Sequence, residues 1–134
     1  MIKVVLDTNI FISSIFWEKG NPRKIIDFAL DKKFRVFVTL EILEELQKAM
    51  QRDFEESEEK IQAQVKLIMT FAELIQAKPE IDIIKSDQDD NKILDCAFSI
   101  RADFIVSGDH HLLELKEFKE IKILTPKQFL EFFT

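Results

Sequence analysis

Two short apolar runs, each leading into an aspartate, constrain the fold of this chain more than any other feature of it. Residues 2–7 are largely apolar and β-branched and end at Asp7, and residues 104–107 lead through a glycine into Asp109. Runs of this kind are typical of strands that are buried on both faces of a parallel sheet. Ligand sites in such sheets lie beyond the carboxyl ends of the strands. The two runs therefore predict an acidic site at one edge of an α/β sheet.

The hydrophobic pattern of the whole chain predicts strands that alternate with helices. Strands are expected at residues 2–7, 35–38, 81–84, 104–107 and 121–124. Helices, most of them behind a capping residue or a proline, are expected at residues 10–16, 22–30, 39–51, 57–77, 90–102 and 112–115, and from residue 126 onward. This alternation predicts a three-layer α/β/α fold, in which helices cover both faces of a central parallel sheet.

Length and composition indicate one domain over residues 1–134, because the chain has only two Gly and three Pro and no linker-like tract. No apolar run approaches the length of a membrane-spanning helix. Asp7 interrupts the first apolar run too early for a signal peptide. The single cysteine, Cys96, cannot form an intrachain disulfide, and it is expected to be a core thiol. These features favour a cytoplasmic protein with no membrane association.

The charge of the chain limits how it can meet a nucleic acid. A net charge of −6 and a pI near 5.0 argue against broad electrostatic binding to a phosphate backbone. A nucleic-acid enzyme with this charge needs a local basic strip, bridging metal ions or a basic partner protein. The 13 Phe residues, beside one Trp and no Tyr, are expected mainly to pack the core.

Helical geometry separates the acids of the helix after Thr39. The apolar arc of this helix is formed by Ile42, Leu43, Leu46, Ala49 and Met50. At about 100° per residue, Glu45 falls at the border of that arc and Glu44 falls toward solvent. Lys48 and Arg52 share the flank of Glu45. The alternative is an ordinary surface ladder of charge pairs.

The helix at residues 90–102 carries another candidate acid. Its buried face is expected to contain Ile93, Leu94, Ala97, Phe98 and Ile100. Asp90 lies on this stripe, whereas Lys92 and Asp95 lie off it. The alternative role for Asp90 is an N-terminal cap, and caps are also the alternative for Asp7 and Asp109. Four acids that converge without matched bases nevertheless suggest a site for a hard divalent cation.

Four segments of the chain together form a recognisable pattern. They are Asp7-Thr8-Asn9, Glu45-Leu46, Asp87-Gln88-Asp89-Asp90-Asn91 with Leu94 and Ala97, and Ala102-Asp103-Phe104-Ile105-Val106-Ser107-Gly108-Asp109 with Leu112-Leu113. In these segments the chain resembles the PIN domain family, and the last two are especially similar to bacterial and archaeal PIN-family toxins of toxin–antitoxin systems. These segments occur in the family's order and span nearly the whole chain.

The resemblance implies a Rossmann-like sheet and a Mg²⁺- or Mn²⁺-dependent ribonuclease that acts on single-stranded RNA. Its acidic residues, the expected catalytic and metal-binding set, fall on Asp7, Glu45, Asp90 and Asp109. Its small polar residues fall on Thr8, Asn9 and Ser107, with Asp95 as a neighbouring acid behind the first layer of ligands. With RNA as the implied substrate, Lys48 and Arg52 are candidates for contact with it. The resemblance further suggests a homodimer and an antitoxin partner. His110 and His111 are expected to be exposed at the start of a helix, although a pair of His can bind a softer metal.

Three other readings of the acids make different demands on the sequence. A phosphatase with a nucleophilic carboxylate needs a second acid two residues later, and position 9 is Asn. A receiver domain needs an aspartate after a mid-chain strand, but residues 36–38 lead to Thr39. A PIN-fold scaffold that binds protein or RNA without catalysis stays open as the alternative function.

Overall fold

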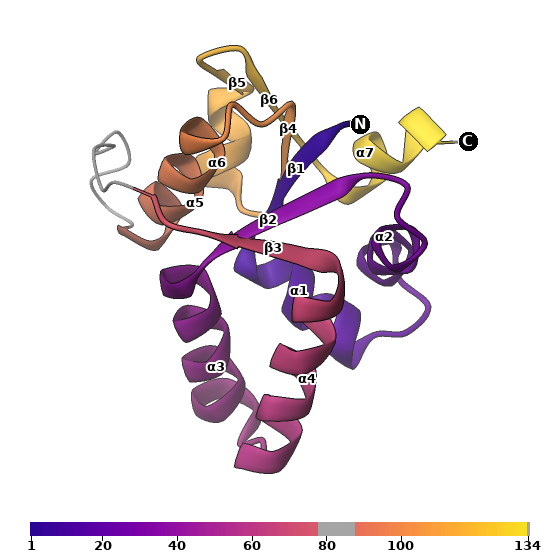
Figure 1. The fold of residues 1–134 in the computed structure, drawn as a ribbon, viewed down its shortest axis with the longest axis vertical. Helices are drawn as coiled ribbons and strands as arrows, with labels where there is room; N and C mark the ends of the chain where they lie inside the picture. The colour runs from indigo at the N-terminus through magenta and orange to yellow at the C-terminus, as the bar shows by residue number, and fades with distance from the viewer. Residues whose placement is uncertain (78–87, 134) are drawn as a thin grey trace.

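The central sheet confirms the predicted α/β architecture. The computed structural model describes residues 1–77 and 88–133, apart from the side chains of residues 88–90. Within these residues the sheet has six strands in the order β3-β2-β1-β4-β6-β5 (Figure 1). The strands are β1 (Lys3–Leu6), β2 (Arg35–Thr39), β3 (Ala72–Ile75), β4 (Phe104–Val106), β5 (Glu117–Phe118) and β6 (Ile121–Leu124). All neighbours pair in parallel except β5 and β6.

The order of the strands creates a switch point in the centre of the sheet. From β1 the chain adds β2 and β3 on one side, and it then returns to build β4, β6 and β5 on the other side. The connections leave β1 and β4 in opposite directions, which opens a crevice beyond their carboxyl ends. Leu6 pairs with Val106 across these two strands, so Asp7 and Ser107 follow side by side.

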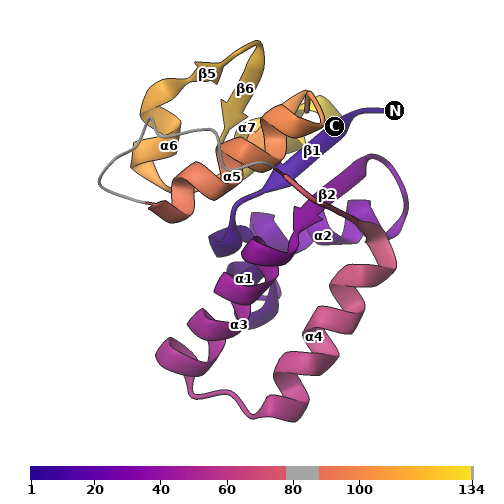
Figure 2. The same ribbon diagram turned by 60° about the vertical axis from the view of Figure 1, so that its left-hand side comes forward.

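Helices cover both faces of the sheet. They are α1 (Thr8–Phe16), α2 (Asn21–Leu30), α3 (Leu40–Phe54), α4 (Glu58–Phe71), α5 (Gln88–Ser99), α6 (His110–Leu115) and α7 (Pro126–Leu130), with a final 3₁₀ turn at Glu131–Phe133. Successive strand residues face opposite sides, and Val4 and Val5 are both fully buried. The α3–α4 pair extends away from the sheet (Figures 1 and 2). No helix within the described ranges is long and apolar enough to span a membrane.

The helix starts follow the local signals in the sequence. Thr39 and Ser57 cap α3 and α4 by accepting hydrogen bonds from Ile42 N and Lys60 N, at 3.2 and 3.3 Å. Thr125 and Gln128 form a reciprocal capping box at α7, with bonds of 3.1 and 2.9 Å. Each cap satisfies backbone groups that a helix end leaves without an intrahelical partner.

The prediction of one helix over residues 57–77 is wrong at its carboxyl end. The helix ends at Phe71, and Ala72–Ile75 form strand β3 against β2. Arg35 of β2 forms a two-bonded ion pair with Glu73 of β3, with N–O distances of 2.8 and 2.7 Å. Residues 72–75 gain backbone hydrogen bonds by pairing with β2 at the edge of the sheet. The hydrophobic periodicity of the sequence does not show this tertiary pairing. The strand expected at residues 81–84 lies outside the described residues, and β5 was not predicted.

The buried face expected for α5 is also wrong in part. Asp95 is buried, with an exposed fraction of 7%, and Phe98 is 37% exposed, whereas Cys96 is fully buried as expected. The helix packs on β1, β2 and β4 and also against α3, so its buried surface is much wider than one stripe. Burial confirms the core position of the Cys96 thiol. Burial first, and then the charges of Glu41 and Asp95, raises the pKa of this thiol to about 12.

Phenylalanine rings join α7 to the sheet. Phe129 is fully buried, and its ring lies 5.1 Å from Phe34, 5.9 Å from Phe104 and 5.2 Å from Phe133, measured between centroids. We expect Phe129→Ala to lower the free energy of unfolding by about 3–5 kcal/mol, since it leaves a cavity among these rings. Phe132→Ala is the matched control, because Phe132 is 56% exposed and its loss should cost about 1 kcal/mol or less. Denaturant unfolding measures both, and equal losses would contradict this packing.

Candidate active site at the carboxyl ends of β1 and β4

A buried hydroxyl links the two strand-end aspartates. The Ser107 Oγ–H donates a hydrogen bond of 2.6 Å to Asp7 Oδ2, and the Asp109 backbone N–H donates one of 2.9 Å to Ser107 Oγ. Ser107 is fully buried, and Asp7 is only 5% exposed. The Asp7 backbone N–H also donates to Val106 O at 2.9 Å, which extends the β1–β4 pairing by one residue. Residues a hundred positions apart in sequence therefore form one hydrogen-bonded unit.

The environment of Asp7 disfavours its charged form. Burial is the largest cause and raises the pKa of its carboxyl above the ordinary value, and the nearby charge of Asp109 raises it further. The Ser107 hydroxyl and the backbone N–H groups of Thr8 and Asn9 act in the opposite direction, but burial dominates. Asp7 stands at the N-cap position of α1, yet its side chain makes no capping hydrogen bond. The first N–H groups of α1 therefore favour the ionised form of Asp7 only in part, and they do not offset the cost of its burial.

Asp109 combines a capping role with its place beside Asp7. Its Oδ1 accepts a 2.7 Å hydrogen bond from the His111 backbone N–H at the start of α6. The Asp109 side chain is 21% exposed, so the carboxylate still reaches solvent. His111 Nδ1 lies 3.7 Å from the same Oδ1, and the rings of His110 and His111 are 4.1 Å apart. His110 is exposed as predicted, and His111 is half-buried.

The other two predicted acids come from helices at the same edge. Glu45 is half-buried on α3 and Glu44 is exposed, as helical geometry indicates. Among the described side chains, Asp7, Asp109 and Glu45 do not form a metal-sized group of three acids, and no other such group of Asp, Glu, His or Cys exists. Asp90 lies in the first turn of α5, and its side chain is outside the described part of the chain.

The polar residues predicted to support the acids differ in burial. Thr8 is buried, with 9% of its surface exposed, and Asn9 is exposed. Asp95 was predicted to lie off the buried face of its helix, but it is buried. Asn91, which was not predicted as a site residue, is 3% exposed in the first turn of α5. The burial of a polar side chain near the start of a helix marks it as a possible site residue. Its position on a helical wheel alone does not reveal this burial.

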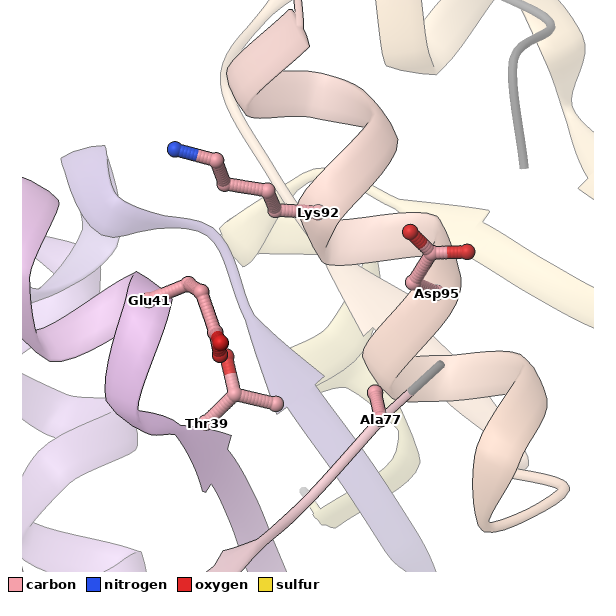
Figure 3. Close-up of a pocket in the computed structure, with 5 residues that line it drawn as sticks. All are labelled: Thr39, Glu41, Ala77, Lys92 and Asp95. Carbon is pink, nitrogen blue, oxygen red and sulfur yellow. The ribbon is translucent and has the colours of Figure 1, made fainter. Parts of the chain in front are cut away.

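A small cavity lies beside this edge of the sheet, between α3 and α5. It has a volume of about 210 Å³ and is lined by Thr39, Glu41, Ala77, Lys92 and Asp95. Thr39 and Glu41 form one wall, and Lys92 and Asp95 form the other (Figure 3). Lys92 and Asp95 are one helical turn apart on α5, so one face of that helix supplies both charges. The sequence pattern did not single out Glu41 or Lys92 as site residues.

The two cations predicted to contact RNA lie on the surface of α3. Lys48 and Arg52 are both exposed. Arg52 forms a two-bonded ion pair with Asp53, at 2.9 and 3.0 Å. Exposed pairs of this kind contribute little to stability.

The raised pKa of Asp7 generates a prediction about stability without added metal. The folded state holds the Asp7 proton more tightly than the unfolded chain does, so this contribution to stability is present at low pH. It is lost as the pH rises from the ordinary value of 3.8 through the raised pKa. Asp7→Asn, which carries no charge, should therefore melt at a higher temperature than the wild type at pH 7 in chelator.

The advantage of Asp7→Asn should shrink as the pH falls toward 4, where the wild-type carboxyl regains its proton. Thermal melts between pH 4 and 8 measure the difference, with Glu44→Gln as the control for loss of an exposed carboxylate. An Asn variant that is less stable than the wild type throughout this range would contradict the assignment of burial as the dominant cause.

Comparison with known proteins agrees with this architecture. The PIN domain family model matches residues 3–111, which include both strand-end aspartates. An uncharacterized protein of Methanocaldococcus jannaschii is 30% identical over 144 residues, covering 98% of this chain and 92% of that protein. The structure of VapBC2 from Rickettsia felis bound to a DNA fragment from their promoter is similar, with a TM-score of 0.68 and 14% identity, over 92% of this chain and 98% of the matched chain. The chain thus belongs to the PIN domain family.

Proposed function

We propose that this protein is a Mg²⁺- or Mn²⁺-dependent endoribonuclease that hydrolyses phosphodiester bonds in single-stranded RNA. The observation that carries the proposal is the hydrogen-bonded Asp7–Ser107–Asp109 unit at the switch point of the sheet, in which Asp7 and Ser107 are buried. Burial of the Asp7 carboxylate beside the charge of Asp109 raises the electrostatic cost of ionising Asp7. A bound cation offsets that cost, which is why such pairs are typical of metal sites.

The donor chemistry fits a hard divalent cation. Mg²⁺ prefers oxygen ligands and keeps several of its waters, so two or three carboxylates are sufficient protein ligands. We assign Asp7, Asp90 and Asp109 to hold one or two ions, and Glu45 to hold a second ion or to orient the attacking water. When bound, the cation supplies a more acidic water and stabilises charge on the phosphate during in-line displacement.

The surrounding polar residues position the carboxylates. Ser107 orients one Asp7 oxygen through its 2.6 Å hydrogen bond. Thr8 and Asn9 begin α1 beside Asp7, and their backbone N–H groups favour its ionised form. Asp95, which is buried in the middle of α5, is assigned a supporting role behind the carboxylates that would bind the metal. Groups of this kind fix the orientation of metal ligands and tune their basicity.

We further propose that the protein is the toxin of a toxin–antitoxin pair, works in the cytoplasm and forms a homodimer. This rests on the resemblance of its motifs to PIN-family toxins and on its structural likeness to VapBC2. An antitoxin with a basic segment would complement the acidic net charge of −6.

A non-catalytic PIN-fold scaffold for protein or RNA is the second candidate. The observation that favours it is the use of Asp109 as the cap of α6, together with the absence of a three-acid group among the described side chains. In that case the carboxylates would serve only to stabilise the fold. Added metal would then neither stabilise the protein nor cause cleavage of RNA.

The decisive experiment follows a labelled single-stranded RNA with the purified protein in Mn²⁺, in Mg²⁺ and in EDTA. We expect cleavage in either metal and none in EDTA. Asp7→Asn and Asp109→Asn should each lower the rate by at least about 100-fold, since each removes a charge that holds the ion. The same two changes should abolish most of the increase in melting temperature that metal gives the wild type.

Glu44→Gln serves as the matched control, because Glu44 is an exposed acid next to Glu45 on α3. It should cleave RNA at the wild-type rate. Full activity of the wild type in excess chelator would refute the metal-dependent reading. A folded wild type that binds metal and cleaves none of a varied set of RNAs would favour the scaffold.

The flank of α3 gives a second test of the RNA reading. If Lys48 and Arg52 each contact a phosphate, changing both to Glu should weaken RNA binding. It should also reduce the slope of log affinity against log salt by about 1.4, at about 0.7 per lost contact with a single strand. Fluorescence anisotropy of labelled RNA between 50 and 300 mM salt measures the slope. An unchanged slope would place the RNA elsewhere on the surface.

A further inference from the structure

The cavity between α3 and α5 lies one strand spacing from Asp7. Its wall residue Thr39 is the last residue of β2, and the parallel register pairs Val5 of β1 with Phe37 of β2. Continued by two residues through extended backbone, this register places Thr39 opposite Asp7. Neighbouring strands of a sheet lie about 4.7–4.9 Å apart. The cavity is therefore next to the candidate active site, at the same edge of the sheet.

The two helices that form the cavity also carry two of the candidate acids. Glu41 lines the cavity from the first turn of α3, and Glu45 follows it by four residues, about 6 Å further along the helix. Residues four apart lie on one face of a helix. Asp95 lines the cavity from α5, and Asp90 lies in the first turn of the same helix. The walls of the cavity thus continue into the candidate site.

The charges on these walls disfavour a charged occupant. The Glu41 side chain extends from α3 toward α5, and the Lys92 side chain extends from α5 toward α3 (Figure 3). Glu41 and Asp95 repel an anion such as a phosphate, whereas Lys92 repels a cation such as the guanidinium of a partner protein. Carboxylates are pure hydrogen-bond acceptors and an ammonium is a pure donor. The facing walls therefore suit a neutral group that has donors beside an acceptor.

The size of the cavity narrows the choice further. Its volume of about 210 Å³ is several times the roughly 30 Å³ of one water. It is also below the roughly 300–1,000 Å³ of sites for drug-sized ligands. A single planar base is a polar, neutral group of this intermediate size. Under the proposed function, the bases nearest to the site are those that flank the scissile phosphate.

Guanine is the base whose edge matches the two walls. Its Watson–Crick edge has the acceptor O6 beside two donors, N1–H and the N2 amine. One carboxylate takes two parallel N–H donors, and an ammonium has three donors, so Lys92 can reach O6 while it keeps a partner within the protein. Adenine and cytosine have one donor group on this edge, and uracil has one donor between two acceptors. None of these three satisfies both oxygens of the Glu41 carboxylate.

We propose that the cavity is a guanine-selective subsite for the nucleotide next to the scissile phosphate. Glu41 accepts hydrogen bonds from N1–H and the N2 amine, and Lys92 donates to O6. The inference rests on the proposed ribonuclease function and adds base selectivity to it. Single-stranded RNA suits such a subsite, because its unstacked bases expose their Watson–Crick edges.

Guanosine is the first probe, because this neutral nucleoside needs neither metal nor phosphate contacts. Titrations in EDTA, followed by saturation-transfer NMR, compare it with adenosine, cytidine, uridine and inosine, which lacks the N2 amine. We expect guanosine to bind at least about 5-fold more tightly than each of them, the lower limit for one good bidentate pair. 7-Deazaguanosine keeps the Watson–Crick edge and should bind like guanosine.

Variants of the two walls assign the contacts. Glu41→Gln replaces one acceptor oxygen with an amide donor and should weaken guanosine binding by about 5- to 150-fold. Lys92→Met should weaken guanosine and inosine alike, because both present O6. Glu44→Gln is the matched control, because Glu44 is an exposed acid of the same helix that does not line the cavity, and it should bind like the wild type. Glu41 is also exposed, so its variant should keep the fold.

Cleavage in Mn²⁺ tests whether the cavity reads the substrate. The probe is an end-labelled oligouridylate that contains one internal guanine, and the cut positions are mapped by the length of the products. We expect the cuts to gather next to the guanine. The same RNA with inosine or adenine at that position should be cut there at least about 5-fold more slowly. Glu41→Gln should cut the guanine RNA without this preference.

The outcomes separate this inference from the proposed function. Equal binding of all nucleosides, or binding of none, would overturn the guanine subsite and leave cleavage by the wild type unaffected. Guanosine-selective binding with cuts that ignore guanine would assign the cavity to a free guanine nucleotide, and the proposal would be wrong. Guanosine-selective binding that Glu41→Gln abolishes, without cleavage of any RNA in any metal, would support the guanine site and contradict the nuclease.

Discussion

The hydrogen bonds through the Ser107 hydroxyl hold the architecture and the candidate site together. This one oxygen donates to Asp7 at the end of β1 and accepts from the backbone of Asp109 beyond β4. The two strands are adjacent only because the chain completes the β2–β3 half of the sheet before it returns to form β4. The site therefore depends on the longest-range pairing in the fold. Any change that shifts the β1–β4 register by one residue would turn Asp7 and Ser107 to opposite faces.

Sequence patterns predicted the parts of this fold in which local signals and tertiary packing agree. The buried strands β1 and β4 could be identified because a strand buried on both faces has a continuous apolar run. The acids that follow them could be identified because ligand sites lie beyond the carboxyl ends of such strands. The strand β3 could not be identified, because Ala72–Ile75 continue the apolar pattern of α4 and become a strand only through pairing with β2. The burial of Asp95 was missed for a similar reason. One helical wheel describes one contact face, whereas α5 packs against both the sheet and α3.

The candidate site shows a related limit of sequence reasoning. From the sequence, Asp7 and Asp109 could each have been only a helix N-cap. The structure shows different roles for the two side chains. Asp109 caps α6 with one oxygen, whereas the Asp7 side chain makes no N-cap hydrogen bond at α1 and carries the cost of burial. A cap and a ligand are not exclusive, because a carboxylate has two oxygens and several lone pairs. The energetic signature of a site is therefore the burial of Asp7, which spacing in the sequence cannot measure.

Under the proposed function, an acidic chain that acts on RNA must resolve an electrostatic conflict. With a net charge of −6 and carboxylates at the crevice, the protein repels a phosphate backbone at long range. Metal ions held by these carboxylates would neutralise them and remove the repulsion at the crevice itself. The same ions would therefore serve the binding of the strand as well as its cleavage.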